Sequence, residues 1–211
     1  MTNFIPIFPL NIVVYPGEDL NLHIFEPRYK QLVAECFAAK KPFGVPAVLG
    51  DKLQDHGSLL DIVEVSKTYD DGEMDIRTRA NKVFRILEII RDLPDKLYSG
   101  AIVNYPENRE QGSVEQMKKI LVSIRELHRE LKVEKDFHKP DDQLTSYDVA
   151  HHVGLSTEEE YELLGLFDER QRQEYLKRHL AKVMPTVSGM EQLKEKIKLN
   201  GHFKNLSGFN L

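Results

Sequence analysis

The sequence contains no tryptophan and only one cysteine, Cys36, among its 211 residues. A single cysteine excludes an internal disulfide framework and is typical of a reducing compartment, so we expect a cytoplasmic protein. No apolar run approaches the roughly 20 residues that a membrane span needs, and we expect no membrane partner. The opening MTNFIPIFPL has no basic segment and contains two prolines, which is not the pattern of a signal peptide.

Motifs of catalysis are also missing. No G-x-x-x-x-G-K-[ST] loop occurs, so the sequence has no phosphate cradle. No serine stands in a G-x-S-x-G context, where many hydrolases place their nucleophile. We therefore expect a protein that is not an enzyme, with no catalytic residue and no cofactor. The net charge of -5 gives no reason to expect strong, non-specific binding to nucleic acid.

Histidines are the residues that most invite a metal interpretation: His128, His138, His151, His152 and His179. Neighbouring histidines on a helix point about 100° apart and cannot easily share one ion. The sequence has no H-x-x-x-H or C-x-x-C pair to complete a site. We expect no metal site, and we interpret these histidines as capping groups or as part of a solvated helix face.

Residues 1–108 have the pattern of a strand-rich domain. Short apolar runs (FIPIF, NIVVY, NLHIF, FGVPAVL) and longer alternating runs (SLLDIVEVSKTY, MDIRTRANKVFRILEII, LYSGAIVNY) are separated by Pro and Gly. Asp71-Gly72 predicts a hairpin turn, because both residues tolerate a positive φ. The alternation changes phase at Ala80-Asn81, which predicts a β-bulge or bend like those at the corners of small closed barrels.

One helix interrupts these strands. Glu26-Pro27 predicts its start, since proline is tolerated at the first helical position. Helical spacing then predicts one buried stripe as far as Lys40, made of Tyr29, Leu32, Val33, Cys36 and Phe37. On this stripe Cys36 is interpreted as a small core residue rather than as a catalytic thiol.

Residues 109–200 predict a bundle of helices, followed by a tail at 201–211. Ser113 and Ser156 each begin a capping-box pattern, with Gln116 and Glu159 three residues later. The last helices are rich in cations, including Arg172, Lys194, Lys196 and Lys198. A solvated helix face is the favoured interpretation of this charge, with an acidic partner or an RNA backbone as the alternative.

The run FPLNIVVYPGEDLNLHIFEPRY resembles the opening of the N-terminal domain of Lon proteases. The resemblance continues through FGVPAVL, DDGEMDIRTRANKVFRI and the helical segment, and so covers almost the whole chain. It implies an α+β fold: a PUA-like, β-barrel-like N-terminal domain with one embedded helix, followed by a C-terminal helical bundle. The positions of the signature are Phe8, Pro9, Pro16, Gly17, Phe25, Glu26, Arg28 and Tyr29.

A full Lon also has an ATPase domain and a serine–lysine protease domain, and neither is matched here. The resemblance therefore implies a stand-alone, non-catalytic Lon-type domain that binds unfolded or extended polypeptide. A role in protein quality control or as an adaptor would follow, with a protease or a chaperone as partner. It also implies that the domain helps oligomerisation, and a weak homo-oligomer is the corresponding expectation.

Glu26, Arg28 and Tyr29 have two interpretations. In the first, Glu26 accepts hydrogen bonds from the free N–H groups of the helix, while Arg28 pairs with a carboxylate on the barrel. These residues then lock strand to helix. In the second, they contact a ligand directly. We favour the structural lock.

The polypeptide would bind in an apolar groove between the barrel and the helices, or along an unpaired strand edge. Apolar side chains expected at the surface of loops are the candidate contacts: Phe43, Tyr69, Leu97 and Tyr98. The alternative function is RNA binding, which is motivated by the PUA relationship and would use Lys194, Lys196 and Lys198. A third alternative is a small-molecule sensor with an apolar, aromatic-walled pocket. Because the sequence has no tryptophan, that pocket could not be a tryptophan cage.

Overall fold

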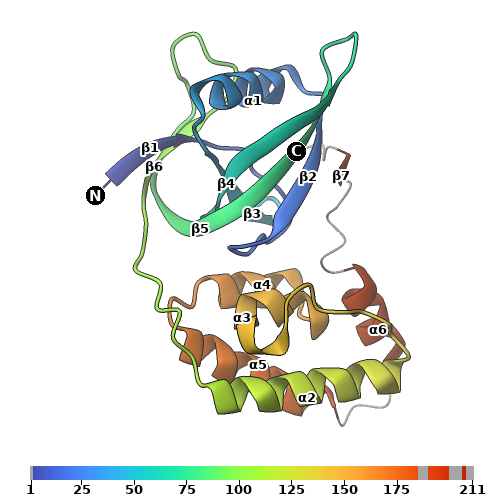
Figure 1. The fold of residues 1–211 in the computed structure, drawn as a ribbon. Helices are drawn as coiled ribbons and strands as arrows, with labels where there is room; N and C mark the ends of the chain where they lie inside the picture. Colours follow the sequence, from blue (N-terminus) through green and yellow to red (C-terminus); the bar gives the residue numbers. More distant parts are fainter. Residues whose placement is uncertain (1, 185–189, 200–205, 208–211) are drawn as a thin grey trace. The chain divides into compact units, whose positions relative to one another are not determined.

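The structure is a computed structural model that describes residues 2–184, 190–199 and 206–207. The chain divides into two compact units (Figure 1): residues 1–106 with 203–211, called here the sheet unit, and residues 107–202, the helical unit. The predicted boundaries at 108 and 200 stay a prediction. All but two residues of the predicted tail lie outside the described part of the chain.

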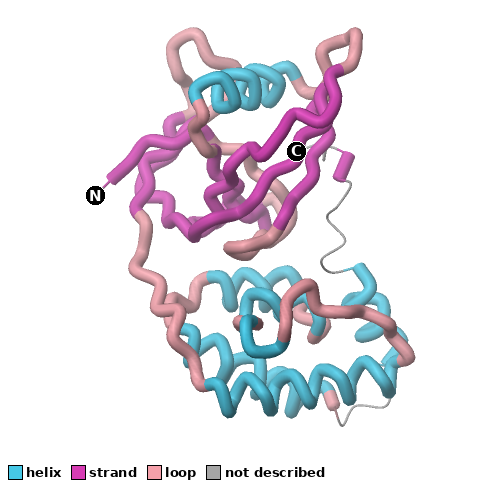
Figure 2. Tube along the Cα trace, in the orientation of Figure 1, coloured by secondary structure: helices cyan, strands magenta, loops and turns pink. Residues whose placement is uncertain are grey.

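The sheet unit contains one mainly antiparallel sheet, drawn in magenta in Figure 2. Its strands are β1 (Thr2–Pro6), β2 (Asp19–Ile24), β3 (Phe43–Leu49), β4 (Lys52–Thr68), β5 (Met74–Ile90), β6 (Gly100–Asn104) and β7 (Leu206–Ser207). The order is β1-β6-β5-β2-β7, and β4 pairs with both β5 and β3. The α+β class is confirmed. The sheet is not closed by continuous strand pairing, so the barrel-like form of the prediction is not confirmed.

The β4–β5 hairpin follows the local signals of the sequence. Gly72 has a φ of 79°, and the amide of Tyr69 donates to the carbonyl of Glu73 across the turn. Further along, Leu60 faces Ala80 while Leu59 faces Lys82, which leaves one extra residue between them, Asn81. The predicted turn and the predicted bulge are both confirmed.

The run NIVVY, residues 11–15, is not a strand, so this part of the prediction is wrong. Its apolar side chains are buried, but its backbone bonds to side chains instead of to a strand ladder. The amide of Tyr15 donates to Glu18 Oε2 at 2.8 Å, while Ser58 Oγ donates to the carbonyl of Val14. The segment is apolar and β-branched because its side chains are buried, and this composition resembles that of a strand.

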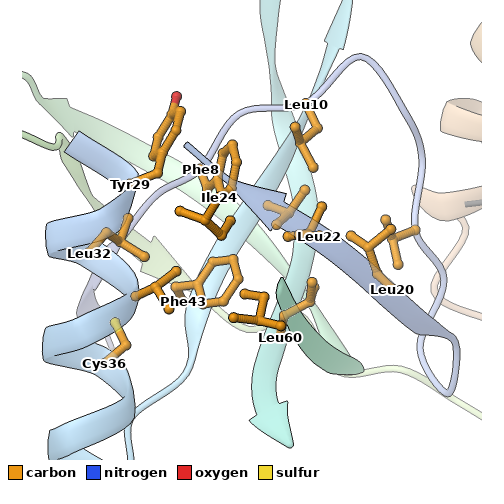
Figure 3. Close-up of a cluster of buried hydrophobic side chains, with 14 of the residues drawn as sticks. Phe8, Leu10, Leu20, Leu22, Ile24, Tyr29, Leu32, Cys36, Phe43 and Leu60 are labelled. Atoms are coloured by element: carbon orange, nitrogen blue, oxygen red, sulfur yellow. The ribbon is translucent and has the colours of Figure 1, made fainter. Parts of the chain in front are cut away.

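Helix α1 (Pro27–Ala39) packs its apolar stripe onto the core of the sheet unit. Tyr29 stacks on Phe8 with ring centroids 3.7 Å apart, and Leu32 and Cys36 point toward the same cluster (Figure 3). Burial raises the pKa of the Cys36 thiol to about 11, as expected for a core residue. Phe37 is the exception in the predicted stripe, because its side chain is exposed.

The helical unit contains α2 (Val114–Leu131), α3 (Ser146–Val149), α4 (Thr157–Leu164), α5 (Glu169–Val183) and α6 (Met190–Leu199). Ser156 and Glu159 form the predicted capping box. Ser113 caps α2 by accepting from the amide of Gln116, but the Gln116 side chain donates to Glu174 instead of returning to the cap. That second box is only half formed.

A buried ion pair lies inside the helical unit. Arg172 Nε donates to Glu169 Oε2 at 3.0 Å, and both side chains are almost completely buried. The other oxygen of Glu169 accepts from the amide and the hydroxyl of Ser146, each at 2.8 Å. Three further acceptors surround the guanidinium: Asn108 Oδ1, the carbonyl of Leu166 and the hydroxyl of Tyr147. These contacts join α3, α5 and the segment before α2.

Candidate functional site

Two of the three strands that end the sheet are protected against pairing with another chain. β1 ends at Pro6, and β3 contains Pro46 with a register shift beside it. The two ends are also linked, since the amide of Phe8 donates to the carbonyl of Gly44 and the amide of Val48 to the carbonyl of Leu10, both at 2.8 Å. Prolines, irregular pairing and cover are the usual devices that keep a sheet edge from adding strands.

β2, which is followed at the third end only by the two-residue β7, has none of these devices. Its register with β5 is continuous from Asp19 to Ile24, and the strand contains neither proline nor lysine. Alternate side chains are buried in the core: Leu20, Leu22 and Ile24. The strand is therefore regular and firmly anchored along one side, while its other side is open to a further strand.

A short strand of the same chain lies along this edge. Leu206 and Ser207 of β7 pair in parallel with Leu22 and His23 of β2 (Figure 1). The pairing covers two of the six residues of β2. Along the rest of the edge, no other strand among the described residues pairs with β2. The edge can thus accept an extended segment in parallel orientation.

An aromatic and acidic corner lies where β2 meets the β4–β5 hairpin. His23 Nδ1 is 2.7 Å from Asp75 Oδ1, and His23 Nε2 is 3.0 Å from Glu73 Oε2. The Tyr69 hydroxyl donates to the second oxygen of Asp75, and the rings of Tyr69 and Phe25 lie 5.7 and 6.3 Å from the His23 ring. The hydrogen bond to Asp75 is the main reason that the pKa of His23 is raised, while the same contact lowers the pKa of Asp75.

The outer face beside this corner is covered by paired charges and one unpaired acceptor. Arg79 bonds to Asp19 at 2.9 Å, and Arg77 bonds to Glu64 at 3.0 Å. Between these rows, the buried side-chain oxygen of Asn21 has no hydrogen-bond donor among the described residues.

Two of the four predicted polypeptide contacts are wrong, because they are buried. Phe43 begins β3, is 0% exposed and packs against the Phe8 ring (Figure 3). Tyr98 is also buried, and its hydroxyl donates to Glu35 at 2.6 Å. Tyr69 is half-buried in the corner described above, and Leu97 is 66% exposed. The structure places these two on different loops, Tyr69 between β4 and β5 and Leu97 between β5 and β6.

The loop that carries Leu97 is tied to α1. The amide of Leu97 donates to Gln31 Oε1 at 2.8 Å, and Gln31 Nε2 donates to the carbonyl of Asp95 at 2.9 Å. Lys96 bonds to both oxygens of Glu35 at 2.8 Å. Leu97 is therefore an exposed apolar side chain on an ordered loop, which lowers the entropic cost of binding through it.

The Glu26–Arg28 prediction needs correction. Glu26 makes no side-chain cap on α1. Its carboxylate instead accepts from Arg28 Nε at 2.8 Å, so the two charges pair with each other and not with the sheet. The guanidinium lies 4.6 Å from the centre of the Tyr29 ring. Within this motif, Tyr29 joins the helix to the sheet unit's core, because its ring stacks on Phe8.

The rest of the signature is structural in this geometry. Gly17 has a φ of 92°, which favours glycine, and its amide donates to the carbonyl of Ala80 at 2.8 Å. Phe8 is buried, whereas Pro9, Pro16 and Phe25 are half-buried. Phe25 alone of these lies beside the aromatic and acidic corner.

Four of the five candidate histidines do not lie on a solvated face, which corrects that interpretation for them, whereas His138 is exposed. His128, His151, His152 and His179 are all buried. His128 and His179 bond to backbone carbonyls at 2.8 and 3.0 Å, and His151 Nδ1 lies 2.7 Å from Glu160. Within the described ranges, no three His, Cys, Asp or Glu side chains come together as a metal site.

Acidification should destabilise the helical unit. Burial lowers the pKa of His128 and His179, and that of His152 to about 2, whereas an unfolded histidine titrates near 6.5. Below about pH 6.5 the unfolded state binds more protons, so each buried histidine lowers stability by up to about 1.4 kcal/mol per pH unit. We expect hydrogen exchange in α2 and α5 to quicken steeply between pH 7 and 5, after correction for intrinsic rates.

His152→Phe is the matched variant for this test. The His152 ring lies between the rings of Phe137 and His128, with centroid distances of 4.7 and 5.7 Å. A phenylalanine ring can occupy the same position without a titratable group. In this variant, unfolding should take up about one proton fewer, so the free energy of unfolding should depend less steeply on pH. Stability that does not change between pH 7 and 5 would contradict the assignment of neutral, buried histidines.

The basic residues proposed for RNA do not form an exposed cluster as a set. Lys196 and Lys198 are exposed, Lys194 is half-buried, and Lys198 lies 4.0 Å from Glu195. Arg172, from the same basic region, is buried in its ion pair. No observation in the described part of the chain favours RNA. Nor does any helix described here have the length and apolar character to cross a membrane.

Comparison with known proteins agrees across both units. The family model of the ATP-dependent protease La (LON) substrate-binding domain matches residues 5–182. A Lon N-terminal domain protein from Xanthomonas campestris has a similar structure, with a TM-score of 0.64 and 25% identity, covering 83% of this chain and 98% of that one.

The N-terminal domain of a Mycobacterium avium complex Lon protease gives a TM-score of 0.65 at 14% identity, over 86% of this chain and all of the other. At that identity the likeness shows the fold alone. A comparison with curated proteins gives no match.

Proposed function

Because this chain belongs to the family of ATP-dependent protease La (LON) substrate-binding domains, we propose that it binds unfolded or extended polypeptide. The match over residues 5–182 carries this proposal, since it includes both units. The protein acts without catalysis of its own and delivers clients in the cytoplasm to a protease or chaperone, in a quality-control or adaptor role. A weak homo-oligomer would increase its avidity for long clients.

Features of the sheet unit support this role. Leu97 presents an apolar side chain on a loop held by α1, and Tyr69 presents a ring beside the regular edge of β2. Polypeptide recognition commonly combines main-chain hydrogen bonds at a strand edge with a few apolar or aromatic contacts. No observation favours RNA over polypeptide.

A titration with a permanently unfolded protein tests this function. Fluorescently labelled, reduced and carboxymethylated α-lactalbumin should bind the full chain at micromolar concentrations, measured by anisotropy. Tyr69→Ala and Leu97→Ala should each weaken binding about fivefold, because each removes an anchor of the order of 1 kcal/mol.

The matched control is Val122→Ala, which trims an exposed apolar side chain on the helical unit's α2. Its affinity should stay within about twofold of the parent. No association at tens of micromolar would sink the proposed function. Equal losses in all three variants would remove Tyr69 and Leu97 from the site.

A further inference from the structure

We propose that the open edge of β2 is where the client binds, as an added parallel strand, and that the chain's own β7 holds this edge until a client replaces it. The inference rests on the proposed function, which it extends by naming the site, the binding mode and a competitor. It makes β7 (Leu206–Ser207) an internal competitor of client binding.

The contrast between the sheet ends is the first argument. β1 and β3 contain prolines, and residues 7–10, which follow β1, are hydrogen-bonded to residues 44–48 of β3. β2 has a continuous register, no proline and no lysine. A regular edge without these devices is a template for another strand, so the fold leaves one such template open.

The second argument is the strand that occupies it. β7 pairs in parallel through Leu22 and His23 only. Asp19, Leu20, Asn21 and Ile24 have no strand neighbour on that side among the described residues. A client extended over all six residues of β2 would form more main-chain hydrogen bonds than β7 does, and could therefore displace it.

The side chains of β2 indicate the kind of client. Along an added strand, alternate residues lie beside the buried row of Leu20, Leu22 and Ile24, while the others lie beside Asn21 and His23. The first set would be apolar. The second set would be hydrogen-bond donors, because Asn21 has an unpaired oxygen and His23 is flanked by Asp75 and Glu73.

A reversible cross-link in the full chain tests the proposal. His23 and Ser207 are direct partners across β2 and β7, and neighbouring strands bring Cα atoms within the span of a disulfide. The double variant His23→Cys/Ser207→Cys should therefore oxidise readily. Cys36 stays in place, because it is buried with a raised pKa and reacts slowly.

The oxidised double variant should bind labelled, carboxymethylated α-lactalbumin at least about tenfold more weakly than its reduced form, and dithiothreitol should restore binding. The two single-cysteine variants control for the loss of His23 and Ser207. Conversely, Leu206→Pro/Ser207→Pro, which removes both β7 amide donors, should strengthen binding about fivefold. Leu206→Ala/Ser207→Ala keeps both donors and is its matched control.

The outcomes are separable. A cross-link that does not form, or one that forms and leaves client affinity unchanged, overturns the inference while the proposed function stands. Stronger client binding by the proline variant and weaker binding by the cross-linked one support it. If no variant binds the unfolded client, the proposed function has failed, and cross-link formation then reports only where β7 lies.

Discussion

Replacing Phe43 with alanine should destabilise the sheet unit by about 3–5 kcal/mol, because it removes a fully buried aromatic ring from a packed core. The ring is 0% exposed and lies in the cluster that joins α1 to the sheet, 6.3 Å from the Phe8 ring (Figure 3). Hydrogen exchange of the β4 and β5 amides measures this change for the sheet unit alone. Those amides should exchange faster by about two to four orders of magnitude.

Leu97→Ala is the matched control for this substitution. Leu97 is 66% exposed, so its truncation should change the stability of the sheet unit by no more than about 0.5 kcal/mol. The sequence predicts a surface position for both Phe43 and Leu97, but in the structure only Leu97 is exposed. Phe43→Ala that left stability intact while weakening client binding would restore Phe43 to the binding surface and contradict the core assignment.

Arg172→Met should destabilise the helical unit by about 3–5 kcal/mol, because it leaves the carboxylate of Glu169 buried without its partner charge. The two side chains are 2% and 3% exposed. The substitution also removes the donor for Asn108 and for the carbonyl of Leu166, bonded at 2.8 and 2.6 Å. Hydrogen exchange in α5 and loss of helical circular dichroism in urea would both report it.

Two further variants test whether the loss of stability comes from the unpaired buried charge of Glu169 or from substitution in α5 as such. Glu169→Gln/Arg172→Met removes both charges and should recover part of the loss, since no uncompensated charge remains. Lys177→Met breaks an exposed pair with Glu174 at 3.2 Å and should cost less than about 1 kcal/mol. A double variant no more stable than Arg172→Met would show that the charge imbalance is not the cause.

The features predicted correctly from the sequence depend on neighbouring residues. The turn at Asp71-Gly72 needs a residue with positive φ, the bulge at Asn81 appears as a change of phase, and proline at the first helical position begins α1. Each is decided by the backbone preferences of a few adjacent residues, so each can be read locally.

The features predicted wrongly depend on distant partners. Phe43 follows a proline and resembles a loop residue, but α1 and the Phe8 segment cover it. Arg172 belongs to a charged helix, and its burial depends on Glu169 together with groups from residues 108, 147 and 166. Neither alternation nor helical spacing contains this information.

One missed feature did have a local signal. Thr145-x-x-Asp148 forms a further complete capping box, with Asp148 accepting from the Thr145 amide at 2.8 Å. The usual capping-box pattern is Ser or Thr followed by Glu or Gln, but here the shorter Asp148 side chain closes the same ring. The open edge of β2 had no local signal, since it is defined by what the other strands pair with.

Hydrogen exchange of the full chain, with and without saturating carboxymethylated α-lactalbumin, tests the central claim most directly. If an extended client adds to the sheet, exchange should slow in β2 (Asp19–Ile24), while the amides of β1 and β3 change little. Saturated binding with protection confined to the helical unit, or with no protection in β2, would contradict the account.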